Sequence, residues 1–210
     1  MRLLPCGDLA ILVELDDAAG RRRLDAVLRR TPVLGVVDHV PAARTVLVKV
    51  GSPNDLQGVA ARLRALDLSD LTDREDASVA PDAPPLQLAV RYDGPDLSDV
   101  ARHLGIHPAE VVSRHTGQLW SVEFSGFAPG FGYLVGDDGG LDVPRRDSPR
   151  TRIPPGSVGL AGPFTGVYPR PSPGGWQLIG RTDEVMWDAA REPPALLVPG
   201  RRIQFVEVRG

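Results

Sequence analysis

The 210-residue sequence contains one cysteine, Cys6, and one lysine, Lys49, so 23 of its 24 basic residues are arginine. A single cysteine excludes an internal disulfide bond and a cysteine-based metal cluster, and it fits a reducing cytosol. A Walker phosphate loop and a Schiff base both need a lysine amine, so neither can exist away from Lys49. Any carboxylate or phosphate bound by the C-terminal half must therefore be held by arginine side chains and backbone N–H groups.

The sequence also lacks long apolar runs and an excess of positive charge. No segment approaches the roughly 18 apolar residues of a membrane span, and the N-terminus lacks the pattern of a signal peptide. A net charge of −3 and a pI near 5.8 provide no attraction for a phosphate backbone. We therefore expect a cytoplasmic protein that binds neither membranes nor, in general, nucleic acids.

The first 80 residues predict a small α/β domain. Short apolar segments predict strands, and amphipathic segments with capping residues predict helices. The predicted order is a strand at 9–15, a helix at 16–30 with Asp16 as its N-cap, strands at 33–40 and 45–50, and a helix at 52–66. A closing strand at 86–92 would complete a ferredoxin-like unit. Residues 68–85 are acidic and proline-bearing, which predicts a linker with a domain boundary near residue 80.

Residues 81–210 predict a second domain that is mostly β. Two short helices are expected at 96–104 and 108–115, with Gly105 ending the first. A strand at 119–124 and apolar segments at 157–161, 177–179, 185–187, 195–198 and 203–208 follow, separated by turn residues. Many short strands with Gly/Pro turns indicate an antiparallel barrel or sandwich, with Trp187 and Phe205 in its core. The predicted class of the whole chain is α+β.

The segment 126–180 is the part around which we expect the protein to be organised. It holds 13 glycines and 9 prolines in 55 residues, a composition typical of disorder. It also holds six of the eleven aromatic residues, which a solvated linker would not need: Phe127, Phe131, Tyr133, Phe164, Tyr168 and Trp176. We therefore predict tightly turned, packed β structure with rigid loops that face a ligand.

Two features of this half are candidates for chemistry. His115 ends a predicted helix, where it could either cap the helix or act as an acid or base. Four arginines lie within residues 144–152 between prolines, which suits a carboxylate or phosphate but is also typical of a solvated loop. The histidines lack metal-ligand spacing, so we expect no metal site.

Ordered motifs along the chain resemble the allophanate hydrolase subunit 1 family. They are YDGPDL at 92–97, GFAPGFGYL at 126–134, PRR at 144–146, PR at 149–150, PGSV at 155–158, TGVYP at 165–169 and SPGGW at 172–176. This family includes the B-subunit of bacterial ATP-dependent 5-oxoprolinase and a sporulation-kinase inhibitor of the Bacillus type. The similarity covers essentially the whole chain and is weaker before residue 80.

The resemblance implies an N-terminal α/β subdomain followed by a cyclophilin-like β-barrel. It implies a hetero-oligomer with a C-subunit, the allophanate hydrolase subunit 2 protein, and it allows for a lactam-binding A-subunit. The implied reaction opens the lactam of 5-oxo-L-proline to L-glutamate with ATP, with or without Mg²⁺. The implied catalytic candidates are His115, Arg145, Arg150 and Tyr168. The implied substrate- or nucleotide-binding loop residues are Gly126, Phe127, Pro129, Gly130, Tyr133, Gly174, Gly175 and Trp176.

Two positions depart from the family pattern. Phe164 stands where a glutamine usually precedes the TGVYP motif, and Arg201 replaces an acidic residue after Pro199-Gly200. We expect these departures to concern the family's substrate contacts and to leave the fold intact. Two other functions stay open at this point: a subunit of a urea- or allophanate-processing amidohydrolase or carboxyltransferase, and an inhibitor of histidine-kinase autophosphorylation.

Overall fold

The computed structural model describes residues 1–68 and 83–208. Contacts divide the chain into two units, Met1–Ala77 and Ser78–Gly210, each with its own apolar core. Most of the predicted linker at 68–85 lies outside the described residues, so the linker stays a prediction. Within the described ranges, no helix is long and apolar enough to cross a membrane.

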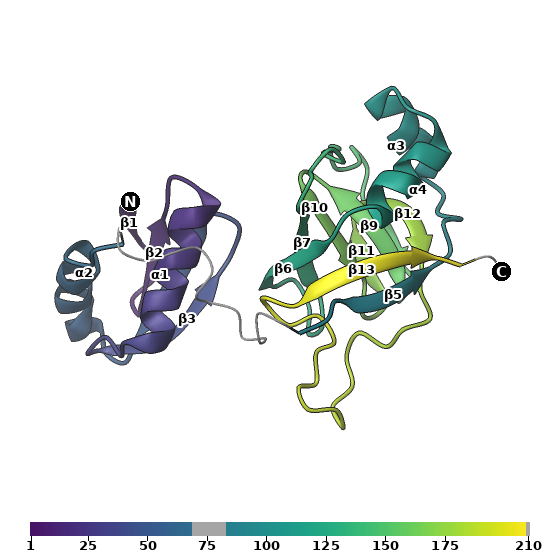
Figure 1. Ribbon diagram of the computed structural model, residues 1–210. Coiled ribbons are helices and arrows are strands. Elements are labelled where there is room, and N and C mark those ends of the chain that lie inside the picture. The colour runs from purple at the N-terminus through teal and green to yellow at the C-terminus, as the bar shows by residue number, and fades with distance from the viewer. Residues whose placement is uncertain (69–82, 209–210) are drawn as a thin grey trace. The chain divides into compact units, whose positions relative to one another are not determined.

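The N-terminal unit is a four-stranded antiparallel sheet with two helices (Figure 1). Its strands are β1 (Arg2–Pro5), β2 (Ala10–Glu14), β3 (Val36–Pro41) and β4 (Thr45–Val50), in the order β1-β2-β4-β3. Its helices are α1 (Ala18–Arg30), the 3-10 turn η1 (Pro53–Asp55) and α2 (Leu56–Arg64). Asp17, rather than the predicted Asp16, caps α1, and its side chain accepts a hydrogen bond from the Gly20 N–H at 2.7 Å.

The predicted closing strand of this unit was wrong. β5 (Leu86–Val90) belongs to the second unit, where it pairs in parallel with β13 (Arg202–Glu207). The edge position expected for β5 is taken by β1, which pairs antiparallel with β2. β1 was missed because it is only four residues long and includes a proline, which weakens a strand pattern. The sheet order is therefore ferredoxin-like, with its edge strand supplied by the N-terminus.

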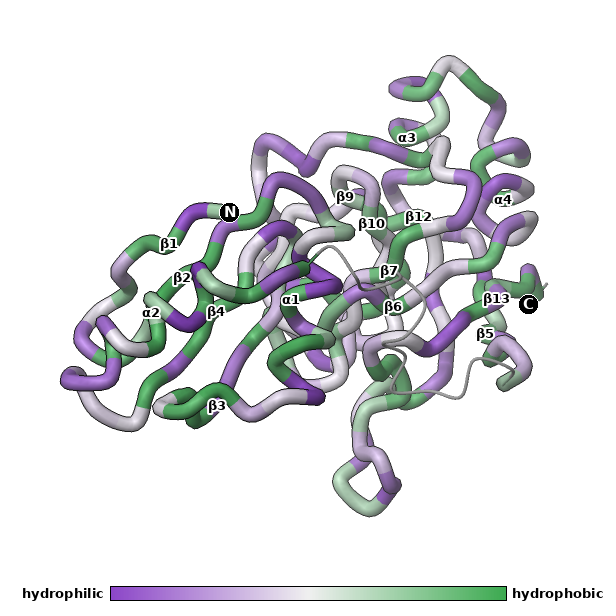
Figure 2. The backbone as a smooth tube through the Cα atoms, turned by 60° about the vertical axis from the view of Figure 1, so that its left-hand side comes forward, coloured by the Kyte–Doolittle hydropathy of each residue, from purple (hydrophilic) through white to green (hydrophobic). Residues whose placement is uncertain are grey.

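The C-terminal unit contains two helices, α3 (Leu97–Leu104) and α4 (Pro108–Thr116), and a seven-stranded sheet. The sheet strands are β5, β6 (Trp120–Ser125), β7 (Gly132–Gly136), β9 (Ser157–Ala161), β10 (Phe164–Val167), β12 (Gln177–Arg181) and β13. β8 (Arg150–Ile153) and β11 (Ser172–Gly174) form a separate two-stranded ribbon. α3 ends at Leu104, and the next residue, Gly105, has a positive φ of 68°. The prediction that Gly105 ends this helix is confirmed. Green and purple alternate along both helices, as expected of amphipathic helices (Figure 2).

The seven-stranded sheet curls into a nearly closed barrel. Its order is β12-β9-β10-β7-β6-β13-β5, so β5 and β12 are the two ends. Arg91 and Arg181 join these ends by exchanging two backbone hydrogen bonds of 2.8 and 2.9 Å. Every pair of neighbouring strands in the sheet is antiparallel except β5 with β13, so the predicted antiparallel barrel needs one correction. Closure matters because it leaves little unpaired strand edge.

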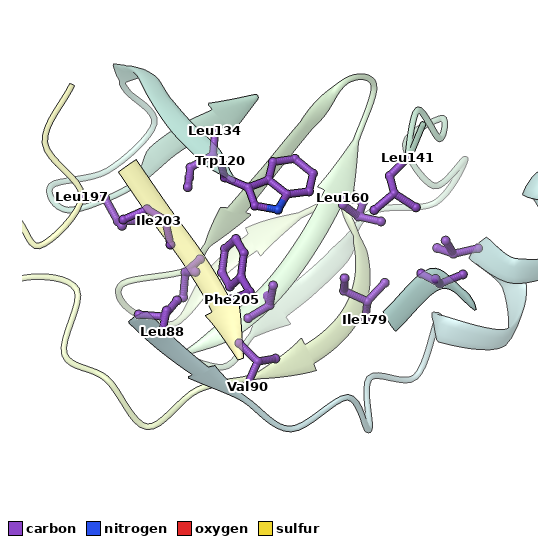
Figure 3. Packing of buried hydrophobic residues seen from close by; sticks show 14 of the residues in the cluster. Leu88, Val90, Trp120, Leu134, Leu141, Leu160, Ile179, Leu197, Ile203 and Phe205 are labelled. Atoms are coloured by element: carbon purple, nitrogen blue, oxygen red, sulfur yellow. The ribbon is translucent and has the colours of Figure 1, made fainter. Parts of the chain in front are cut away.

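Large apolar side chains fill the barrel interior (Figure 3). Trp120 and Phe205 meet edge to face with ring centroids 6.1 Å apart, and the prediction of Phe205 as a core residue is confirmed. The matching prediction for Trp187 was wrong, because this residue is 43% exposed. The expected strands at 185–187 and 195–198 are instead an irregular loop with one bridge between Trp187 and Ala195. Met186 and Leu197 are buried there, which explains the apolar pattern.

Replacement of Gly94 tests the barrel closure. A Cβ at Gly94 would overlap the backbone of Leu178 and Ile179 in β12, so we expect Gly94→Ala to cost about 2–4 kcal/mol of unfolding free energy. Urea unfolding followed by tryptophan fluorescence reports this unit, because all three tryptophans lie in it. Gly126→Ala is the control, since its Cβ would meet only a Tyr133 ring atom at 3.5 Å. Equal unfolding midpoints for the two variants would contradict this account.

Candidate functional site

Most of the aromatic residues of segment 126–180 pack together in a second core, separate from the barrel interior. We call Phe127, Phe131, Tyr133, Tyr168 and Trp176 the aromatic cluster. Phe131 is its centre, with ring centroids 5.1 Å from Tyr133, 5.3 Å from Tyr168 and 5.2 Å from Trp176. The edge-to-face geometry of these pairs adds specific contacts to the burial of large side chains. The prediction that this segment is packed β structure is therefore confirmed.

The loop between β6 and β7 displays Phe127 in a strained conformation. Phe127 has a φ of +64°, and in the described ranges it is the one non-glycine residue with positive φ. The Ala128 N–H bonds to the Gly126 carbonyl at 2.7 Å, so Phe127 is the centre of a γ-turn of the rare, strained kind. Phe127 as a whole is 57% exposed. Strain of this kind costs roughly 1–3 kcal/mol and is concentrated at functional positions.

A second turn follows at once and fixes the other end of this loop. The Phe131 N–H bonds to the Ala128 carbonyl at 2.9 Å, across Pro129 and Gly130. Gly130 has a φ of +85°, so proline and glycine occupy the positions that a type II turn requires. A Cβ at Gly130 would also lie 2.9 Å from the Cβ of Trp187, which shows how closely this loop packs on the loop after β12.

Gly174 and Gly175 hold the arginine segment against the aromatic cluster. A Cβ at Gly174 would overlap the Tyr168 hydroxyl, so only glycine lets this strand approach the phenol. The Gly175 carbonyl accepts a hydrogen bond from the Arg146 N–H at 2.8 Å. A Cβ at Gly175 would stand 4.0 Å from the Cβ of Arg145. These contacts bring the predicted glycine, aromatic and arginine residues into one region.

Asp96 is the buried anion to which two of the arginines bind. Both terminal nitrogens of Arg150 donate to the Asp96 carboxylate at 2.8 Å, and Nη1 of Arg146 donates at 2.8 Å. The backbone N–H of Leu178 adds a fourth hydrogen bond at 2.7 Å. The Asp96 side chain is only 2% exposed. Arg150, predicted as a catalytic residue, therefore has its fork occupied by a carboxylate of its own chain.

The environment of Asp96 favours its charged form. Burial alone would raise the pKa of Asp96, but hydrogen bonds from Arg150 and Leu178 and the charges of Arg150 and Arg146 lower it below its usual value. Sequence reasoning missed this residue because it gave Asp96 no role beyond the start of the predicted helix at 96–104. Asp96 does occupy the N-cap position of α3, but its side chain makes no capping hydrogen bond. The arginine run at 144–152 was the one signal in the sequence that a buried acidic partner was needed.

Arg145 differs from its two neighbours. Its side chain is exposed, and no acidic residue of the described ranges forms an ion pair with it. Burial raises the pKa of Tyr168 to about 12 and also raises that of Tyr133, and the charge of Arg145 opposes both shifts. Arg145 is therefore close enough to act on both phenols, which stay protonated hydrogen-bond donors at neutral pH.

His115 lies in the barrel interior and not at this site. It is 0% exposed, Tyr92 Oη lies 2.8 Å from its Nδ1, and Thr165 Oγ1 lies 2.9 Å from its Nε2. Burial lowers the pKa of His115 to about 3, so it is neutral. The Thr165 hydroxyl donates to the Gly159 carbonyl, so it accepts from the imidazole and fixes the tautomer. The interpretation of His115 as an acid or base is corrected, because it has no access to a substrate.

Phe164, one of the two departures from the family pattern, meets Tyr133 edge to face with ring centroids 5.7 Å apart, so it packs against the aromatic cluster. A groove of about 290 Å³ lies in the other unit, lined by β1, β2 and α2, with Leu3, Ile11 and Ala60 among its residues. In the described ranges, no three residues of His, Cys, Asp or Glu are grouped to hold a metal. The aromatic cluster and its arginines are therefore the candidate functional site.

Substitution of Asp96 tests the ion cluster. We expect Asp96→Asn to cost about 3 kcal/mol near neutral pH, because two partly buried arginines lose their partner. A lowered pKa gives stability that is present above the unfolded value near 4 and lost as pH falls through the folded value. The difference between wild type and variant in urea unfolding should therefore shrink below about pH 4. Asp99→Asn, which breaks an exposed pair with Arg102, is the control and should change little.

The comparisons with known proteins agree on one family. A model described as the carboxyltransferase domain, subdomain C and D, matches residues 1–197. A protein of Escherichia coli O157:H7, named as the B-subunit of 5-oxoprolinase, is 37% identical over 210 residues, 95% of this chain and 93% of that protein. A protein of Bacillus subtilis with the same name is 47% identical over 115 residues, 55% of this chain and 48% of that protein. The resemblance to this family is therefore confirmed.

Solved structures show the same fold. The structure of TTHA0988 is 35% identical with a TM-score of 0.73, and the match covers 96% of this chain but only 40% of that one. The conserved uncharacterized protein PH0987 of Pyrococcus horikoshii is 30% identical with a TM-score of 0.56, covering 99% of this chain and 97% of that one. The urea carboxylase of Kluyveromyces lactis has a TM-score of 0.73 at 20% identity, with coverages of 99% and 22%, and shares the fold alone.

Proposed function

Because this chain belongs to the carboxyltransferase domain family, subdomain C and D, we propose that it is the B-subunit of a two-protein, ATP-dependent 5-oxoprolinase. The single observation that carries the proposal is the 37% identity to a protein of that name over nearly the full length of both chains. The proposed partner is the C-subunit, with a lactam-binding A-subunit working beside them. Since the reaction consumes ATP, we propose a cytoplasmic location.

The proposed reaction opens the five-membered lactam of 5-oxo-L-proline. One C–N bond breaks and one water is added, with its hydroxyl going to the carbonyl carbon and a proton to the nitrogen, which gives L-glutamate. An amide is unreactive because its carbonyl carbon is a poor electrophile, and ATP turnover supplies the free energy that drives the opening. Donors aimed at the carbonyl oxygen, where negative charge develops, would lower the barrier.

The described residues support a contributing role rather than a complete active site. The aromatic cluster excludes water, Arg145 offers a guanidinium, and the half-buried Tyr133 offers an O–H donor. With His115 in the core, the proposed site has no acid-base candidate with a pKa near neutrality among these residues. We therefore propose that the C-subunit provides the missing groups, in accord with the naming of the relatives as one subunit of several.

Reconstitution tests this proposal. The purified chain alone should release no glutamate from 5-oxo-L-proline, whereas the chain purified together with the C-subunit should do so only when ATP is present. Glutamate release and ADP formation would be followed together, and the two rates should match. Urea and allophanate serve as alternative substrates in the same assay. ATP-dependent turnover of either of them, with 5-oxo-L-proline untouched, would replace the proposed substrate, as would suppression of a histidine kinase by the chain alone.

A further inference from the structure

We propose that Arg145 and the aromatic cluster bind the carboxylate and ring of a small cyclic monoacid, and that the triphosphate of ATP is bound outside this chain. This inference rests on the proposed function, which supplies 5-oxo-L-proline as the monoacid. It goes further by dividing the two substrates between the two proteins of the complex. The charge, the shape and the hydrogen-bond donors of the site each favour this division.

Of the three arginines at 145, 146 and 150, Arg145 is the one that forms no ion pair with an acidic residue of the described ranges. Asp96 engages both terminal nitrogens of Arg150 and one terminal nitrogen of Arg146, so both guanidinium groups already bind a carboxylate. Arg145 is exposed and has no acidic partner among the residues that the structure describes. One guanidinium presents two parallel N–H groups, which match one carboxylate. The arrangement therefore provides a fork for one carboxylate, in a region whose positive charge attracts anions.

Phe127 gives the site a flat apolar wall. The γ-turn holds its ring 5.4 Å from the centroid of Phe131 and 6.0 Å from that of Tyr168, and both pairs meet edge to face. More than half of the Phe127 side chain is nevertheless exposed. A rigid, exposed ring above a buried aromatic floor gives a flat five-membered ring an apolar surface to pack against. The strained turn holds the Phe127 ring in this exposed position, which gives the strain a function.

Tyr133 supplies a hydrogen-bond donor next to this wall. Tyr168 is buried to 2% exposure, so its phenol forms part of the packed surface beneath Phe127. Tyr133 is half-buried and also lies near Arg145. A lactam carries a carbonyl oxygen that accepts such bonds, a short distance across its ring from the carboxylate. An arginine fork beside the O–H donor of Tyr133 therefore matches both polar ends of the molecule.

The same residues fit a triphosphate poorly. Proteins hold triphosphates with several cations and backbone N–H groups, commonly a glycine-rich loop, a lysine and Mg²⁺. Here the lysine of the chain, Lys49, is in the other unit and lies 3.6 Å from Asp38. The charges of Arg146 and Arg150 are partly cancelled by Asp96. The donor set thus matches a monocarboxylate better than a nucleotide, whose triphosphate carries several negative charges.

Kinetics with both substrates, in the complex of this chain with the C-subunit, test the division. We expect Arg145→Ala to raise the KM for 5-oxo-L-proline at least about tenfold while the KM for ATP changes less than about twofold. Arg145→Lys should recover only part of the loss, because an ammonium group lacks the fork. Arg114→Ala is the matched control: Arg114 pairs with Glu110 on the surface of α4, and both KM values should stay at their wild-type levels.

A binding measurement separates this inference from the proposed function. Calorimetric titration of the complex without ATP should show 5-oxo-L-proline binding at least about tenfold more tightly than 2-pyrrolidinone, which has the same ring without the carboxylate. Arg145→Ala should abolish that preference. If turnover is normal but the preference is absent, or if Arg145→Ala raises the KM for ATP instead, the inference is overturned and the proposed function stands. If the Arg145-dependent preference is found without turnover, the proposed function fails and the inference stands.

Discussion

A buried carboxylate holds the functional region of this protein together. Asp96 lies at the N-terminus of α3, and it binds two arginines of the 144–150 segment and the backbone of β12. A carboxylate with 2% exposure would be costly without partners, so its four hydrogen bonds are a condition of the fold. By tying Arg146 and Arg150 to the barrel, it fixes the backbone from which Arg145 projects.

The C-terminal unit has two separate buried cores, to which we assign different roles. One is filled by aliphatic and aromatic side chains and contains a neutral His115 bonded to Tyr92 and Thr165. This histidine is a satisfied polar group within the core. The other interior is the aromatic cluster, which opens through Phe127 to the surface and has Arg145 beside it. The proposed chemistry belongs to the second interior, because Phe127 and Arg145 are exposed there whereas His115 in the first interior is fully buried.

Sequence reasoning found the region of the site but not the roles within it. Glycine, proline and aromatic residues at 126–134 and 172–176 carry their geometry in their residue types, and their packing followed as expected. Which charged residues pair with each other cannot be read from residue types in this way. Asp96 and Arg150 lie 54 residues apart, and no local pattern states that one neutralises the other. The same limit misplaced β5, whose parallel partner β13 begins more than 100 residues later.

What the sequence determined by itself was local: the positions of the four helices and of several strands, the family, and the dependence on arginine that follows from a single lysine. These properties depend on residue types and on neighbours a few positions away, so they can be read along the chain. The tertiary structure decided that His115 is core, that Arg150 and Arg146 bind Asp96, and that Arg145 lies near the phenols. Burial and electrostatic pairing are properties of groups brought together across long separations, and only folding creates them.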